Sequence, residues 1–233
     1  MNADEFQERL DRVQQRIREA CARANRDESD VQLIAVSKTH GPEVIRVAAD
    51  CGVTVLGESK VQEARAKIPM SPGHLSWHLI GHLQTNKIRH AVQLFDTIHS
   101  VDSQRLMEAL DQGCAQVGVT MPIYLEVNVS GERSKYGVEP DDLPTVLEAA
   151  AGCTHLDILG LMTIPPFAPE ADKARPFFAS LRELRERCRG EWGFPFDGLS
   201  MGMSHDFEVA IEEGATCVRV GSALFGDRRA KMG

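Results

Sequence analysis

Lys38 ends a short apolar run within QLIAVSKTHGP, residues 32–42. It is in phase with Ile34 and Val36, so in an extended strand the three side chains share one face. If that face is enclosed, loss of water disfavours the ammonium form and leaves a nucleophilic amine of the kind that forms Schiff bases. A lysine whose ammonium simply reaches water at a strand end is the alternative interpretation, and position alone favours it.

Two loops near the C-terminus are rich in small residues. They lie in LSMGMSHD, residues 199–206, and in VRVGSALFG, residues 218–226. Backbone N–H groups and serine hydroxyls suit phosphate oxygens, and glycine lets an anion approach closely. A helix N-cap role for Ser204 is compatible with this, because capping and anion binding use the same N–H groups. The loops therefore predict a phosphate site that involves Ser200, Ser204, Gly221 and Ser222, and we count Met201 and Arg219 with them as candidate ligand-binding residues.

Three histidines, His74, His78 and His82, are spaced four residues apart. They would line up only in a helix, whereas the surrounding SWHLIGH has the pattern of a strand. No carboxylate or thiolate cluster accompanies them, so we predict no metal site. We expect His82 to lie at the mouth of the site and the other two to pack or hydrogen-bond locally.

The elements that must position these residues alternate regularly along the chain. Residues 3–25 have apolar side chains at helical spacing and predict an amphipathic helix. Strand-like and helical segments then alternate, which predicts a parallel α/β fold. A doubly wound open sheet is the alternative, but the glycine-rich first turn of that fold is missing. The eight predicted strands lie in VQLIAVSKT, VTVLGES, LSWHLIGHL, DTIHSVD, PIYLEVNVS, HLDILGLMTI, FDGLSMGM and TCVRVGSALFG.

We therefore predict a single (β/α)₈ barrel of the TIM type, with an additional N-terminal helix in residues 1–25 that packs on it. No linker or shift of composition divides the chain, so residues 1–233 are expected to form one domain. Active sites of such barrels form at the C-terminal ends of the strands. Lys38 and the two glycine- and serine-containing loops would then meet at one mouth.

Composition narrows the class of protein. The chain has 42% hydrophobic and 26% charged residues and a formal net charge of −8, without a basic patch, which argues against a nucleic-acid partner. Six cysteines are scattered singly, as is typical of a reducing compartment. Neither a signal peptide nor a membrane-length apolar run is evident. We therefore expect a cytoplasmic protein with no membrane partner.

Several spaced motifs together resemble one family, the pyridoxal-phosphate homeostasis proteins (the YggS/PROSC family). The resemblance extends in order from about residue 31 to residue 226. It implies a barrel similar to the N-terminal domain of alanine racemase, with pyridoxal 5′-phosphate held on Lys38 as an internal aldimine. The motifs are AVSKT, GES-VQEA, WHLIGHLQTNK, VNVSGERSKYGV, GLMTI, LSMGMSHD-EVAI-EG and VRVGSALFG.

The resemblance also implies roles for single residues. Ser200, Ser204, Gly221 and Ser222 match the positions that bind the cofactor phosphate, and Arg219 matches the arginine directed at the pyridine nitrogen. Arg keeps its own proton, so the ring nitrogen would stay unprotonated and the ring would be a weaker electron sink.

Other positions match a common loop residue or depart from the family pattern. Lys135 matches a loop lysine of the family and is either a second acceptor for the aldehyde or an ordinary solvated lysine. The family usually has GENY where this chain has GESK, and GP where it has Gly81 and His82. Ser59 and Lys60 thus replace an asparagine and a tyrosine, and Tyr136 replaces a smaller residue.

The resemblance favours a carrier of pyridoxal phosphate, without catalytic residues, whose candidate partners are pyridoxal-phosphate-dependent apoenzymes. Related racemases take a second acid–base group, a tyrosine, from a separate domain of a partner subunit. This chain ends soon after the barrel, so we expect that domain to be absent and the protein to be a monomer. The alternatives are a weak amino-acid racemase that uses Lys38 together with Tyr136 or His82, and a Schiff-base aldolase acting on a phosphorylated sugar.

Overall fold

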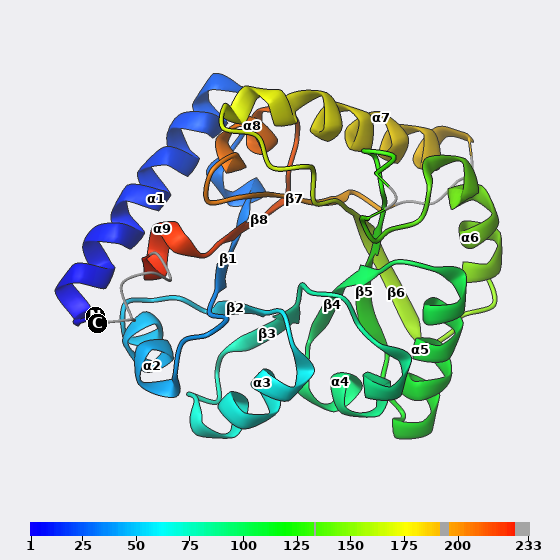
Figure 1. The fold of residues 1–233 in the computed structure, drawn as a ribbon, viewed down its shortest axis with the longest axis horizontal. Helices are drawn as coiled ribbons and strands as arrows, with labels where there is room; N and C mark the ends of the chain where they lie inside the picture. Colours follow the sequence, from blue (N-terminus) through cyan, green and yellow to red (C-terminus); the bar gives the residue numbers. More distant parts are fainter. Residues whose placement is uncertain (133, 192–195, 227–233) are drawn as a thin grey trace.

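The structure is a computed structural model that describes residues 1–132, 134–191 and 196–226. Its centre is a closed parallel barrel in which each strand pairs with the next and β8 pairs with β1 (Figure 1). The predicted (β/α)₈ barrel is therefore confirmed. Its strands are β1 (Gln32–Val36), β2 (Val55–Glu58), β3 (Ser76–Leu79), β4 (Thr97–Val101), β5 (Met121–Glu126), β6 (Leu156–Met162), β7 (Gly198–Met203) and β8 (Cys217–Val220).

Helices follow the strands and form the outer ring of the barrel (Figure 1). These are α2 (Pro42–Asp50), α3 (Val61–Lys67), α4 (Ile88–Leu94), α5 (Gln104–Val117), α6 (Leu143–Ala150), α7 (Arg175–Glu191), α8 (Phe207–Glu212) and the short α9 (Ser222–Phe225). Single 3₁₀ turns lie at η1 (Glu28–Asp30), η2 (Ile68–Met70), η3 (Thr85–Lys87), η4 (Pro140–Asp142) and η5 (Ala171–Ala174).

The predicted N-terminal helix is α1 (Ala3–Arg23), which begins where the Asn2 side chain accepts a hydrogen bond from the Glu5 N–H at 2.8 Å. Its apolar stripe is buried against the barrel, and α1 lies along α8 and α9 (Figure 1). Phe6 contacts Phe225 of α9 with ring centroids 5.4 Å apart. The helix thus covers the element that follows β8.

Two layers of apolar side chains surround the strands. The larger layer fills the space between barrel and helices, and a smaller cluster inside the barrel contains Ile34, Tyr124, Met162 and Cys217. Ile34 is fully buried, so the face of β1 that the alternation assigned to Ile34 and Val36 is indeed enclosed. All six cysteines are free thiols. Among the described residues, no helix has the length and apolar character needed to cross a membrane.

Candidate functional site

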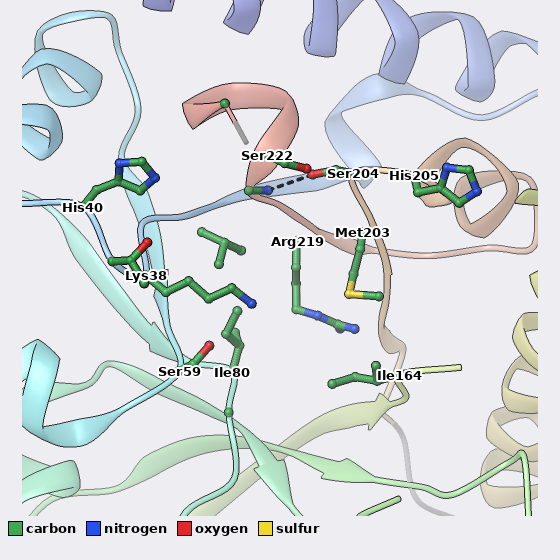
Figure 2. Close-up of a pocket in the computed structure, with 15 residues that line it drawn as sticks. Lys38, His40, Ser59, Ile80, Ile164, Met203, Ser204, His205, Arg219 and Ser222 are labelled. Carbon is green, nitrogen blue, oxygen red and sulfur yellow. Dashed lines mark hydrogen bonds between the residues drawn. The ribbon is translucent and has the colours of Figure 1, made fainter. Parts of the chain in front are cut away.

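A cavity of about 740 Å³ opens at the C-terminal ends of the strands (Figure 2). Side chains from the β1, β2, β3, β6, β7 and β8 ends contribute to it, as the barrel rule predicts. Its lining consists of Val36, Lys38, Thr39, His40, Ser59, Ile80, Gly81, Ile164, Met203, Ser204, His205, Arg219, Gly221, Ser222 and Gly226.

Lys38 comes two residues after the end of β1 and is half-buried. Its side chain extends across the cavity in the direction of Arg219 (Figure 2). The backbone turns sharply just beyond it, because Thr39 has φ of +70°, a left-handed conformation that is rare for a β-branched residue. The Lys38 amine thus lies in the cavity and not along the outer surface of the barrel (Figure 2).

The loops after β7 and β8 meet at Ser204. Its hydroxyl oxygen accepts hydrogen bonds from the backbone N–H of Gly221 at 3.0 Å and of Ala223 at 3.3 Å. Asp206 supports the same loop, because its side chain accepts from the Met203 N–H at 2.6 Å. Two N–H groups thus converge on one oxygen atom at the wall of the cavity. An anionic oxygen could use the same donors.

Arg219 reaches the cavity from β8, although its side chain is almost fully buried. Its Nη1 donates to Ser200 Oγ at 2.7 Å, and its Nη2 donates to the Thr163 carbonyl at 2.8 Å. Burial lowers the pKa of Arg219, while the carboxylates of Glu126 and Asp206 oppose that shift. Both acceptors are neutral, and within the described part of the chain no carboxylate forms a direct ion pair with the guanidinium.

A buried chain of hydrogen bonds continues from Ser200 beneath the cavity. Ser200 Oγ lies 2.8 Å from His99 Nδ1, and His99 Nε2 lies 2.9 Å from His78 Nδ1. Burial lowers the pKa of His78 to about 4 and that of His99 well below its ordinary value, so both imidazoles are neutral at pH 7. Tyr124 stacks on His99 with ring centroids 4.4 Å apart, which closes this layer from inside the barrel.

The structure brings together Lys38, Ser204, Arg219, Gly221 and Ser222 from the predicted set. Ser200 and Met201, the other two members, are fully buried and do not line the cavity.

Residues of the lining that the sequence did not single out include His40, Ile80, Ile164 and His205. The pairing of His99 with Ser200 was also missed. It joins strands 101 residues apart in the chain, for which no local spacing gives a signal.

Of the residues that depart from the family pattern, some line the cavity and others lie outside it. Ser59 lines the cavity, whereas Lys60 is exposed. His82 lies outside the lining, where its Nδ1 is 2.8 Å from Asp102 and its ring stacks on Tyr136 at 4.0 Å. Lys135 is half-buried in the same loop as Tyr136. No cluster of three metal-ligating side chains occurs among the described residues.

Glu126 is a buried carboxyl group at the end of β5, with 6% of its surface exposed. Its pKa is raised to about 7, chiefly by burial and also by Asp102, against the opposing effect of Arg219 and Lys135. The barrel end therefore contains one acid whose charge changes near neutral pH.

Known proteins with similar sequences and structures indicate the family of this chain. A family model described as the alanine racemase N-terminal domain matches residues 9–229. A pyridoxal phosphate homeostasis protein of Aquifex aeolicus is 45% identical over 223 residues, covering 95% of this chain and 98% of that protein. A protein of the same name from Pseudomonas aeruginosa is 43% identical over 226 residues, covering 95% of both. The solved structure of PipY from Synechococcus elongatus with PLP bound has a TM-score of 0.83 and 39% identity, covering 95% of this chain and 100% of that one.

Proposed function

The chain belongs to the alanine racemase N-terminal domain family, among the pyridoxal phosphate homeostasis proteins, and on this premise we propose that it binds pyridoxal 5′-phosphate through Lys38 and carries it without catalysis. One observation carries the proposal. Lys38, Arg219 and Ser204 line a single cavity of about 740 Å³, and the N–H groups of Gly221 and Ala223 converge on the Ser204 hydroxyl oxygen. That volume is in the ordinary range for sites that enclose a small ligand.

The residues present fit the three polar groups of this cofactor. When bound, the cofactor supplies an aldehyde carbon with which a primary amine condenses with loss of water. Lys38 offers the amine for that carbon. The N–H groups of Gly221 and Ala223 already hold one oxygen, that of Ser204, and so are arranged to bind phosphate oxygens. Arg219 supplies a donor for the ring nitrogen and keeps its own proton.

Two features favour a carrier over a racemase. A ring nitrogen that accepts from Arg219 stays unprotonated, which limits the withdrawal of electrons that carbanion chemistry needs. The groups that a racemase would use, Tyr136 and His82, contact each other outside the cavity lining. Tyr136 has 58% of its surface exposed, so its hydroxyl group is not held in a closed site.

The proposal also covers the cellular location, the oligomeric state and the partners of the protein. We place it in the cytoplasm as a monomer that supplies pyridoxal-phosphate-dependent apoenzymes. Six free thiols and no disulfide are consistent with a reducing compartment.

A spectral titration of the cofactor-free protein tests binding through Lys38. Addition of pyridoxal phosphate should produce a visible absorbance band that saturates at one equivalent. Lys38→Ala should lose the band, and Lys135→Ala, which removes a nearby lysine outside the cavity lining, should keep it. A band that survives in Lys38→Ala and disappears in Lys135→Ala would overturn the assignment.

An assay with single enantiomers separates the carrier from the racemase. The loaded protein should leave L-alanine and other L-amino acids optically unchanged. Racemisation that is abolished by Tyr136→Phe would contradict the carrier proposal and establish the racemase alternative.

A further inference from the structure

The backbone on both sides of Lys38 is held by one group of side chains. Lys67 of α3 donates from its Nζ to the Ser37 carbonyl at 2.9 Å. On the other side, the Thr39 N–H donates to Glu63 Oε1. We refer to Glu58, Glu63 and Lys67 as the Lys67 network.

The network is internally connected and largely buried. Lys67 Nζ lies 2.8 Å from Glu58 Oε1 and 2.6 Å from Glu63 Oε1, so one ammonium joins two carboxylates. The same Oε1 of Glu58 accepts from the Ser37 hydroxyl at 2.7 Å. The side chains of Lys67 and Glu58 are only 8% and 0% exposed. Removal of any member therefore affects the anchoring of residues 37 and 39.

The buried ion pair between Glu58 and Lys67 lowers the stability of the fold relative to an apolar pair of the same shape. Burying an ion pair removes two charges from water, and an apolar replacement of the same shape is often at least as stable. Glu58 Oε2 is moreover a buried oxygen without a hydrogen bond in the described part of the chain. A residue with Thr39's φ of +70° persists only where its surroundings hold it there. The buried ion pair and the strained conformation of Thr39 both lie next to the turn that carries Lys38.

We propose that Glu58, Glu63 and Lys67 are positioning residues that fix the turn 37–39 and so direct the Lys38 amine into the cavity. The network acts on the backbone of Lys38 from the helix side and does not line the cavity itself. As far as it concerns the cofactor, the inference rests on the proposed function. Its effect on the lysine can be measured without any cofactor.

Three substitutions in α3 test the role of Glu63. Glu63→Ala removes the acceptor of the Thr39 N–H and leaves the buried Glu58–Lys67 pair in place, and the Glu63 side chain is already 25% exposed. Glu63→Gln keeps an oxygen for the same N–H and serves as the conservative rescue. Gln62→Ala, an exposed neighbour in α3, is the matched control.

The first readout compares two ligands. Glu63→Ala should weaken binding of pyridoxal phosphate about tenfold, because a misplaced amine loses its approach to the aldehyde. Binding of pyridoxine 5′-phosphate, which lacks the aldehyde, should change less than about twofold, since its contacts do not involve the amine. Glu63→Gln and Gln62→Ala should match the unchanged protein. Equal weakening of both ligands, or of neither, would refute a positioning role.

The second readout uses the cofactor-free protein and reductive methylation with formaldehyde and cyanoborohydride, followed by peptide mass spectrometry. A released Lys38 should spend more time in water and be methylated about threefold faster in Glu63→Ala. Lys173, whose side chain is 65% exposed, is the internal reference. An unchanged Lys38 rate refutes the proposal. Because this assay needs no bound cofactor, it decides the role of the network even if the protein proves not to bind pyridoxal phosphate.

Discussion

Arg219 is an unusual residue, because it is buried and the two atoms it is hydrogen-bonded to are neutral. Ser200 provides one of them and is held in turn by His99. The sequence predicts Ser200 as a phosphate ligand; in the structure it is fully buried and its hydroxyl oxygen accepts a hydrogen bond from the Arg219 guanidinium. We infer that Ser200 contributes to the site through Arg219.

Replacing Ser200 by alanine tests this role. Ser200→Ala leaves Arg219 Nη1 and His99 Nδ1 without their shared partner in a dry environment. We expect the free energy of unfolding to fall by about 1–3 kcal/mol, measured by urea denaturation. Ser134→Ala, in an exposed loop, is the control. Equal stability of the two variants would show that the bond to Arg219 contributes nothing.

Glu126 predicts a specific dependence of stability on pH. Its pKa rises from an ordinary 4.5 to about 7 in the fold, so the folded protein binds the extra proton between these values. The resulting stability is fully present below pH 4.5 and is lost as the pH rises through about 7. This amounts to at most about 3 kcal/mol. In Glu126→Gln, the fall in unfolding free energy from pH 5 to pH 8 should be smaller than in the unchanged protein. Identical falls would contradict a titrating Glu126.

At the scale of elements, the loops after β7 and β8 line the side of the cavity to which we assign the phosphate. Close packing restricts the end of β7, because Gly202 has φ of +93° and a Cβ there would lie 2.9 Å from Phe207 Cα. The sequence predicted these loops from their small residues and their place after strands. It did not predict that Ser204 accepts from both Gly221 and Ala223, since that contact depends on how two loops pack.

Ser204→Ala tests the phosphate side of the site. The variant loses the hydroxyl group that orients the Gly221 and Ala223 N–H groups and that we assign to the phosphate as a ligand. Pyridoxal phosphate should bind about tenfold more weakly, whereas pyridoxal, which has no phosphate, should be affected less than about twofold. Spectral titration with both ligands measures the difference. A loss of the same size for both would place the phosphate elsewhere.

The Lys67 network could not be predicted from the alternation of strands and helices. Alternation placed Ile34 and Val36 inside the barrel and Lys38 above them, and the structure agrees. However, Glu58 points to the helix side of β2, where it meets Lys67 of α3. A buried charge on an outward strand face is visible only once the helix that carries its partner has been packed.

At the scale of the molecule, regular alternation was sufficient to predict the barrel, because parallel strands with short crossovers close in few ways. The sequence also predicted α1 from its apolar spacing, but not its contact with α9. Through this contact, the N-terminal helix supports the loop after β8 that contributes Gly221 and Ser222. That residues 1–233 fold as one domain stays a prediction.

Phe6→Ala tests whether α1 belongs to the same folding unit. Phe6 is fully buried and packs on Phe225, so the variant should lose about 3–5 kcal/mol of unfolding free energy. Phe167→Ala is the matched control, because Phe167 is 78% exposed and should change stability by less than about 0.5 kcal/mol. Far-ultraviolet circular dichroism and tryptophan fluorescence should report one coincident transition. Two separate transitions would divide α1 from the barrel.

The central claim is that Lys38 holds the cofactor. Its most direct test is borohydride reduction of the protein loaded with pyridoxal phosphate, followed by peptide mapping. We predict one phosphopyridoxyl group per chain, on the peptide that contains Lys38, and none in that peptide from Lys38→Ala. A label found mainly on Lys135 or another lysine, or no label at all, would contradict the account.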